Sequence, residues 1–198
     1  MSSKEVTEYI YKRFSVEEGY PKRINGTRED LAKLFAELGY STGAEIGVRE
    51  GLFSMILCQN ANPELKLYCI DPWAPYSENP SPRKQRRIFH TAIANLSPYK
   101  KVMLVRKVSE AAMLDVADGA LDFVYIDGDH SAENVKKDIN GWYPKVKLGG
   151  IVSGHDYFIN RRWRRVQVLP VVDAFVRDKD LELFATTEQF PSWFVVKP

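Results

Sequence analysis

The chain has 198 residues, a formal net charge of +2 and 27% charged residues. This length and a 44% share of hydrophobic residues predict a soluble globular protein with a full core, and the small net charge excludes a general attraction to polyanions. No stretch holds the roughly 20 apolar residues of a membrane helix, and the first residues lack the apolar segment of a signal peptide. We expect a cytoplasmic protein that does not contact membranes, with Cys58 and Cys69 as buried free thiols.

The first part of the chain, residues 1–40, predicts an N-terminal helical extension. Val6 and Ile10 fall on one helical stripe. A second helix begins after Thr27, with Asp30 in the position of a capping box. This extension carries no recognisable motif and could support a homodimer.

The rest of the chain, residues 41–198, alternates between apolar strand-like segments and amphipathic helical segments. The expected strands are 44–48, 65–70, 102–106, 123–126, 151–153, 181–185 and 193–196. The expected helices are 51–59, 87–96, 109–114, 131–141 and 169–177, and 74–87 is expected to be a loop. This order predicts an α/β fold, a Rossmann-like, seven-stranded, mainly parallel sheet with helices on both faces. The last two strands are joined too closely for a parallel crossover, so they should form a C-terminal antiparallel hairpin.

A glycine-containing turn follows the first strand of this domain. Gly47 and Gly51 permit a tight turn into a helix and close approach of a ligand to the backbone. Glu45 lies within the strand, where a dinucleotide site would prefer a small residue. An acid there suits a ligand that carries an ammonium group, although such a turn can also be purely structural.

Asp71 ends the second strand, 20 residues beyond Gly51. A carboxylate in this position can accept hydrogen bonds from both ribose hydroxyls, or it can simply cap the turn before Pro72. Together with Glu45, it indicates a ligand with a nucleoside and a positively charged tail. S-adenosylmethionine (SAM) fits that description.

Polar side chains also follow the fourth and fifth strands. Asp127 and Asp129 follow one strand, and His155 and Asp156 follow its neighbour, so we expect their side chains to converge as metal ligands. Oxygen-rich sites suit Mg²⁺, whereas a histidine ligand would also suit Mn²⁺, Zn²⁺ or Fe²⁺. The alternative is that Asp129 and His155 only hydrogen-bond the loop backbone.

His130 lies three residues after Asp127, and a histidine is a credible general base near neutral pH. It could equally cap the following helix. The predicted catalytic pair is therefore Asp127, which would hold a metal that lowers the pKa of a substrate hydroxyl, and His130, which would remove its proton.

Several of these segments carry a resemblance to a known family. EIGVREG, the acid in CIDPW and the run DFVYIDGDHSAENVKKDINGWYPKVKLGGIVSGHDY resemble class I SAM-dependent methyltransferases, and more narrowly the macrocin O-methyltransferase-like and cephalosporin hydroxylase-like proteins. The resemblance implies that residues 41–198 form a methyltransferase domain. It implies that Glu45 and Gly47 contact the methionine end of SAM, with Gly51 and Asp127 beside them. It also implies that Asp71 holds the ribose and that the segment around Ser109 flanks the adenine.

The expected function is metal-assisted methylation of a hydroxyl on a small molecule, such as a sugar or natural product. Two basic clusters, Arg83–Arg87 and Arg161–Arg165, could be solvated surface or could attract an anionic substrate. The alternatives are an NAD-dependent oxidoreductase and a non-catalytic nucleotide- or nucleic-acid-binding protein of the same fold. Glu45 and the terminal hairpin count against the oxidoreductase, and no RNA-binding module accompanies the arginines.

Overall fold

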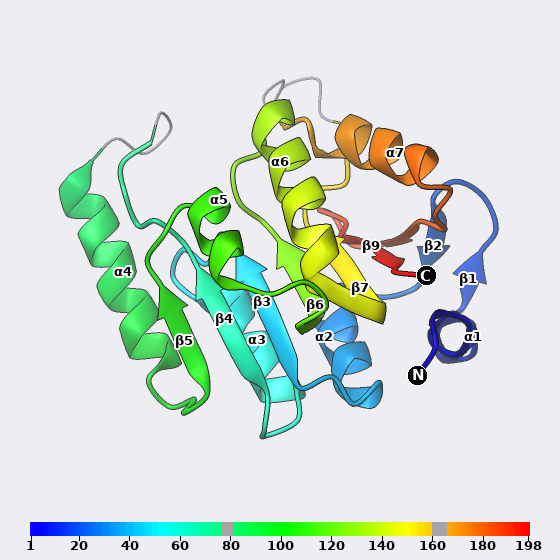
Figure 1. Ribbon diagram of the computed structural model, residues 1–198, viewed down its shortest axis with the longest axis horizontal. Coiled ribbons are helices and arrows are strands. Elements are labelled where there is room, and N and C mark those ends of the chain that lie inside the picture. The colour runs from blue at the N-terminus through cyan, green and yellow to red at the C-terminus, as the bar shows by residue number, and fades with distance from the viewer. Residues whose placement is uncertain (77–80, 160–165) are drawn as a thin grey trace.

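The computed structural model describes residues 1–76, 81–159 and 166–198. A nine-stranded sheet of order β1-β2-β8-β9-β7-β6-β3-β4-β5 forms its centre (Figure 1). The strands are β1 (Val16–Glu17), β2 (Lys22–Ile24), β3 (Thr42–Ile46), β4 (Lys66–Ile70), β5 (Val102–Val105), β6 (Leu121–Ile126), β7 (Val146–Gly154), β8 (Phe184–Thr186) and β9 (Trp193–Val196). The α-helices are α1 (Ser3–Arg13), α2 (Arg28–Glu37), α3 (Leu52–Asn60), α4 (Pro82–Leu96), α5 (Ser109–Ala112), α6 (Ala132–Trp142) and α7 (Val168–Asp178).

Five central strands, from β5 through β4, β3 and β6 to β7, pair in parallel. Strand β9 pairs antiparallel with both β7 and β8. The predicted mainly parallel sheet with a C-terminal antiparallel hairpin is therefore confirmed. Because parallel strands require crossover connections, helices cover both faces of this sheet (Figure 1).

Two further strands come from the N-terminal segment, where the sequence predicted only helices. Strand β2 pairs in parallel with β8, and β1 pairs antiparallel with β2. These strands are two and three residues long, too short to give a period-two pattern that the sequence would reveal. The predicted cap of α2 is present, because the Thr27 N–H donates to Asp30 Oδ2 at 2.9 Å.

The central strand β6 separates two layers of core. Phe123 and Tyr125 face the layer formed with α1, α2, α3 and α4, whereas Val124 and Ile126 face the layer formed with α6 and α7. Phe35 of α2 stacks on Phe123 with ring centroids 4.2 Å apart. A strand buried on both faces needs apolar residues at every position, which explains the continuous apolar run from residue 123 to 126.

Helix α4 begins five residues before the predicted start of 87, so the predicted loop 74–87 is too long. Ser81 is the N-cap residue, and its hydroxyl accepts a hydrogen bond from the Lys84 N–H at 3.2 Å. Pro82 follows at the first helical position, where its missing N–H costs nothing. The basic cluster Arg83–Arg87 therefore lies in the first turns of a helix. The second basic cluster, Arg161–Arg165, lies outside the described residues.

Among the residues that the structure describes, no helix has both the length and the apolar character needed to cross a membrane.

Candidate active site

The loops that follow β3, β4, β6 and β7 meet at one edge of the sheet, which we call the carboxyl edge. Backbone hydrogen bonds continue between neighbouring strands beyond their ends. The N–H of Gly47 donates to Ile70 O at 2.9 Å, that of Asp127 to Ile46 O at 2.8 Å, and that of His155 to Ile126 O at 3.0 Å. These bonds fix the first residue of each loop relative to its neighbour.

Gly47 allows the turn after β3 to pass against the end of β6. Its φ is +90°, and a Cβ at this position would lie 2.0 Å from the carbonyl oxygen of Asp127. Gly51 has a φ of +79° and starts α3. The two glycines therefore have a steric role in this turn, in addition to any contact with a ligand.

Glu45 lies beneath the first turn of α3 rather than on the open carboxyl edge. Its side chain is 2% exposed and accepts a hydrogen bond from the Ser54 hydroxyl. Burial raises the pKa of Glu45 to about 8. The thiol of Cys69 donates to the same hydroxyl at 3.3 Å, so the acid belongs to a small buried polar network.

Asp71 organises the loop that follows β3. Its Oδ2 accepts from the Arg49 N–H at 2.9 Å and its Oδ1 from the Trp73 N–H at 2.7 Å. The Trp73 indole in turn donates to Arg49 O at 2.8 Å. Burial raises the pKa of Asp71 although these N–H groups favour its charged form. Each carboxylate oxygen has two lone pairs, so Asp71 can hold this loop and still accept hydrogen bonds from a ligand.

Asp127, His130 and Asp156 converge at the ends of β6 and β7. His130 Nε2 lies 3.4 Å from Asp127 Oδ1 and 3.2 Å from Asp156 Oδ2. Potential ligand atoms of these three side chains lie within 4.8 Å of one another, so this group of described residues could hold a metal ion. Two carboxylates and an imidazole fit a divalent cation that accepts oxygen and nitrogen ligands.

His155 lies on the other side of the same carboxylates. Its Nδ1 is 3.3 Å from Asp156 Oδ1 and 3.8 Å from Asp127 Oδ2. The Asp156 backbone is left-handed, with a φ of +58°, which costs a non-glycine residue roughly 1–2 kcal/mol. This turn directs the Asp156 side chain between the two imidazoles.

The electrostatics of this cluster couple its acids to its histidines. Burial opposes the charged form of His130, but the hydrogen bond to Asp127 and the charges of Asp127, Asp156 and Asp129 outweigh it and raise the pKa of His130. Burial likewise opposes the charged form of Asp156, but His155 and His130 outweigh it and lower the pKa of Asp156. Without a metal ion, His130 and Asp156 therefore each favour the charged form of the other.

Two predicted site residues lie apart from this cluster. The exposed Asp129 turns toward α6, where its Oδ1 accepts from the Ser131 N–H at 2.8 Å. The Ser109 hydroxyl accepts from the Trp142 indole at 2.8 Å and also bonds Asp138, a buried acid whose pKa burial raises to about 6. In this structure both side chains support helices α5 and α6.

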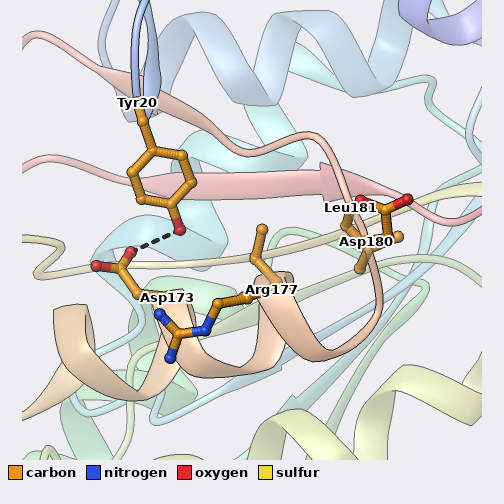
Figure 2. A pocket seen from close by; sticks show the side chains of 6 residues that line it. Tyr20, Asp173, Arg177, Asp180 and Leu181 are labelled. Atoms are coloured by element: carbon orange, nitrogen blue, oxygen red, sulfur yellow. Dashed lines mark hydrogen bonds between the residues drawn. The ribbon is translucent and has the colours of Figure 1, made fainter.

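Asp173 of α7 also lies near the site, and no sequence pattern predicted its role. Tyr157, which directly follows Asp156, donates to Asp173 Oδ1 of α7 at 2.5 Å, and Tyr20 donates to the same oxygen at 3.0 Å. Figure 2 shows the hydroxyl of Tyr20 pointing at Asp173, with Arg177 nearby. These three residues help to line a hollow of about 300 Å³. The two bonds span 16 and 153 residues of sequence, so no local pattern could reveal them. They anchor the loop after β7 to α7.

Comparisons with known proteins agree with this fold. The sheet, with antiparallel β9 between β7 and β8, is that of class I SAM-dependent methyltransferases. The family described as "Methyltransferase domain" matches residues 44–157, more than half of the chain. This protein belongs to that family.

Two curated relatives match part of the chain. The uncharacterised protein R132 of Acanthamoeba polyphaga mimivirus is 31% identical over 150 residues, which cover 76% of this chain and 65% of the viral protein. The uncharacterised protein y4gI of Sinorhizobium fredii is 28% identical over 116 residues, which cover 57% of this chain and 12% of that protein. The chain thus spans less than two thirds of either relative.

Solved structures resemble the fold over almost the whole chain. An O-methyltransferase of Bacillus cereus, in complex with SAH, has a TM-score of 0.64 and 15% identity, with 98% of this chain and 90% of that one covered. The O-methyltransferase TomG of Streptomyces achromogenes, involved in tomaymycin synthesis and in complex with SAM, has a TM-score of 0.64 and 14% identity, with 86% and 80% covered. At sequence identities of 14–15%, this similarity establishes a shared fold and nothing more.

Replacing Gly47 tests the contact between the turn after β3 and the end of β6. We expect Gly47→Ala to lower the free energy of unfolding by about 3 kcal/mol or more, because the overlap with the Asp127 carbonyl involves backbone that no rotamer change relieves. Gly119→Ala is the matched control: its φ is +71°, but a Cβ there meets nothing within 4 Å, so we expect a loss of only about 1–2 kcal/mol. Urea unfolding of both variants measures the difference, and equal losses would contradict the steric argument.

The charge coupling predicts how His130 titrates. In EDTA, we expect NMR of the imidazole to give a His130 pKa above about 6.5, and Asp156→Asn to lower it. Because the pKa is raised by folding, this interaction stabilises the protein below the unfolded pKa and is lost as the pH rises through the folded value. Asp118→Asn, an exposed acid beside Lys145, is the control. A His130 pKa that Asp156→Asn leaves unchanged would contradict the coupling.

Proposed function

We propose that this protein is a SAM-dependent O-methyltransferase that methylates a hydroxyl of a small molecule, such as a sugar or natural product, with the help of a divalent cation. One observation carries the proposal: the carboxylates of Asp127 and Asp156 converge with two imidazoles, those of His130 and His155, on the same edge of the sheet as Asp71. The proposed nucleoside site and the potential metal site would therefore adjoin on a methyltransferase fold.

For the cofactor, Asp71 would accept hydrogen bonds from the ribose hydroxyls, and the turn from Gly47 to Gly51 would lie against the amino-acid end. When bound, SAM supplies a methyl group on a positively charged sulfur. The SAH and SAM in the B. cereus and S. achromogenes enzymes support this choice of cofactor. Glu45 would act from beneath the turn, because its carboxyl group is buried against Ser54.

For the metal, Asp127 and Asp156 would each supply a carboxylate oxygen. Such an ion, Mg²⁺ or Mn²⁺ by its oxygen ligands, supplies a Lewis acid that lowers the pKa of a substrate hydroxyl. The left-handed turn at Asp156 and the backbone bond at Asp127 hold the two carboxylates in place.

The two histidines have different roles in this proposal. Both imidazoles lie within 4 Å of both carboxylates, but the His155 side chain is 14% exposed, whereas that of His130 is 33% exposed and more open to an incoming substrate. We therefore assign His155 as the imidazole ligand and His130 as the general base. Neutralisation of the carboxylates by a cation would lower the pKa of His130 and leave it free to accept the hydroxyl proton.

Basic side chains at the start of α4 support the proposal that the substrate carries an anionic group. Ser81, Arg83, Lys84 and Arg87 line a hollow of about 320 Å³, at the end of α4 that lies toward the carboxyl edge (Figure 1). None of these three basic side chains forms an ion pair with a residue that the structure describes.

Ligand-induced stabilisation tests the cofactor. We expect SAH to raise the melting temperature in thermal-shift measurements and NAD to leave it unchanged, because an amino-acid tail, and not a pyrophosphate, suits the acidic carboxyl edge. Calorimetry then measures the affinity for SAH. Stabilisation by NAD with no response to SAH at high micromolar concentration would contradict the proposed function and favour an oxidoreductase.

Binding of Mn²⁺, followed by its EPR signal, tests the metal site. We expect Asp127→Asn, Asp156→Asn and His155→Asn each to weaken Mn²⁺ binding about tenfold or more. His130→Asn should retain Mn²⁺ but slow the formation of SAH from SAM in the presence of hydroxylated small molecules. Asp129→Asn is the matched control, because this carboxylate faces Ser131 instead of the cluster. Unchanged Mn²⁺ binding in both aspartate variants of the cluster would contradict the metal site.

A further inference from the structure

Arg28, the first residue of α2, places a guanidinium group beside the carboxyl edge. Its N–H donates to Glu188 Oε1 at 2.8 Å, which fixes the start of the helix. Its guanidinium carbon lies 5.3 Å from the centre of the Phe53 ring, in the first turn of α3. Phe53 packs on Tyr125 at 4.2 Å, and Tyr125 lies 6.5 Å from His155. Three successive ring contacts thus connect Arg28 with the metal-ligand cluster.

The charge of Arg28 also reaches the buried acid of β3. It opposes the raised pKa of Glu45. Arg28 is partly buried and forms no ion pair with any residue in the described parts of the chain. Its side chain therefore keeps donors available for an anionic group.

The strand order relates Arg28 to the proposed cofactor. Asp71, the proposed ribose contact, ends β4, and the sheet continues through β3 and β6 to β7. Neighbouring strands lie about 4.8 Å apart, so a nucleoside held at β4 would extend its tail past the Gly47 turn toward β6. Arg28 lies over the Phe53 ring at the start of α3, the helix that follows this turn.

We propose that Arg28 binds the carboxylate of the amino-acid end of SAM. This assignment rests on the proposed function and adds a cofactor contact from the N-terminal segment, outside residues 44–157. A guanidinium group is suited to the task because its paired N–H donors match a carboxylate, and the Phe53 ring orients it. The carboxylate of SAM would then bind the positively charged Arg28. The acids of the carboxyl edge would remain available to interact with the positively charged groups of SAM.

The test compares two nucleosides by calorimetry: SAH, which has the amino-acid end, and 5′-methylthioadenosine, which lacks it. Arg28→Met removes the charge but keeps an apolar side chain on Phe53. We expect it to weaken SAH about 10- to 100-fold, the loss of one charged hydrogen-bonding partner, and to change methylthioadenosine less than about twofold. Arg28→Lys should recover part of the SAH affinity. Arg177→Ala, an exposed arginine on α7, is the control and should leave both affinities unchanged.

The outcomes separate this assignment from the proposed function. If the folded Arg28→Met variant binds SAH like wild type, or loses both nucleosides equally, the assignment is wrong while the proposed function stands. An unchanged SAH affinity combined with weaker turnover of carboxylated acceptors would place Arg28 against the substrate instead, and would also overturn it. Wild-type protein that binds neither nucleoside overturns the proposed function, and the assignment with it.

Discussion

The candidate site depends on the parallel register of β4, β3, β6 and β7 at their carboxyl ends. Hydrogen bonds from Gly47, Asp127 and His155 to the neighbouring strands extend this register into the loops. The turn after β3 can then lie against the Asp127 carbonyl only because residue 47 has no Cβ. One backbone contact thus fixes the distance between the proposed cofactor side and the proposed metal side of the site.

Charge balance is the second constraint at this edge. His130 lies 3.4 Å from Asp127 and 3.2 Å from Asp156, and in the absence of a cation its charged form offsets the repulsion between the two carboxylates. The raised pKa of His130 and the lowered pKa of Asp156 are two expressions of that balance. A divalent ion would replace the His130 imidazole as the source of positive charge, so in the proposed function metal binding would be coupled to the release of this histidine for proton transfer.

The central strands and the acids at their ends could be predicted because both are local signals: an apolar run, then a polar residue where the run stops. Local signals do not show which way a side chain turns. Within residues 127–130 the sequence did not distinguish Asp129, which accepts a hydrogen bond from Ser131 before α6, from His130, which faces the carboxylates. It also placed Glu45 on the strand without showing that Ser54 and α3 cover it. Contacts between distant segments, such as Tyr20 with Asp173, have no local pattern.

The N-terminal segment shows why such distant contacts matter for the site. It continues the sheet through β2, and it brings Arg28 to Phe53 and Tyr20 to α7. Without Arg28, the carboxyl edge would present the carboxylates of Asp71, Asp127 and Asp156 to any anionic part of a ligand. A pyrophosphate there would meet mainly like charge, whereas a zwitterionic tail can place its ammonium group near the acids and its carboxylate near the guanidinium. Under the proposed assignment of Arg28, the segment with the least informative sequence would contribute to the choice between a dinucleotide and SAM.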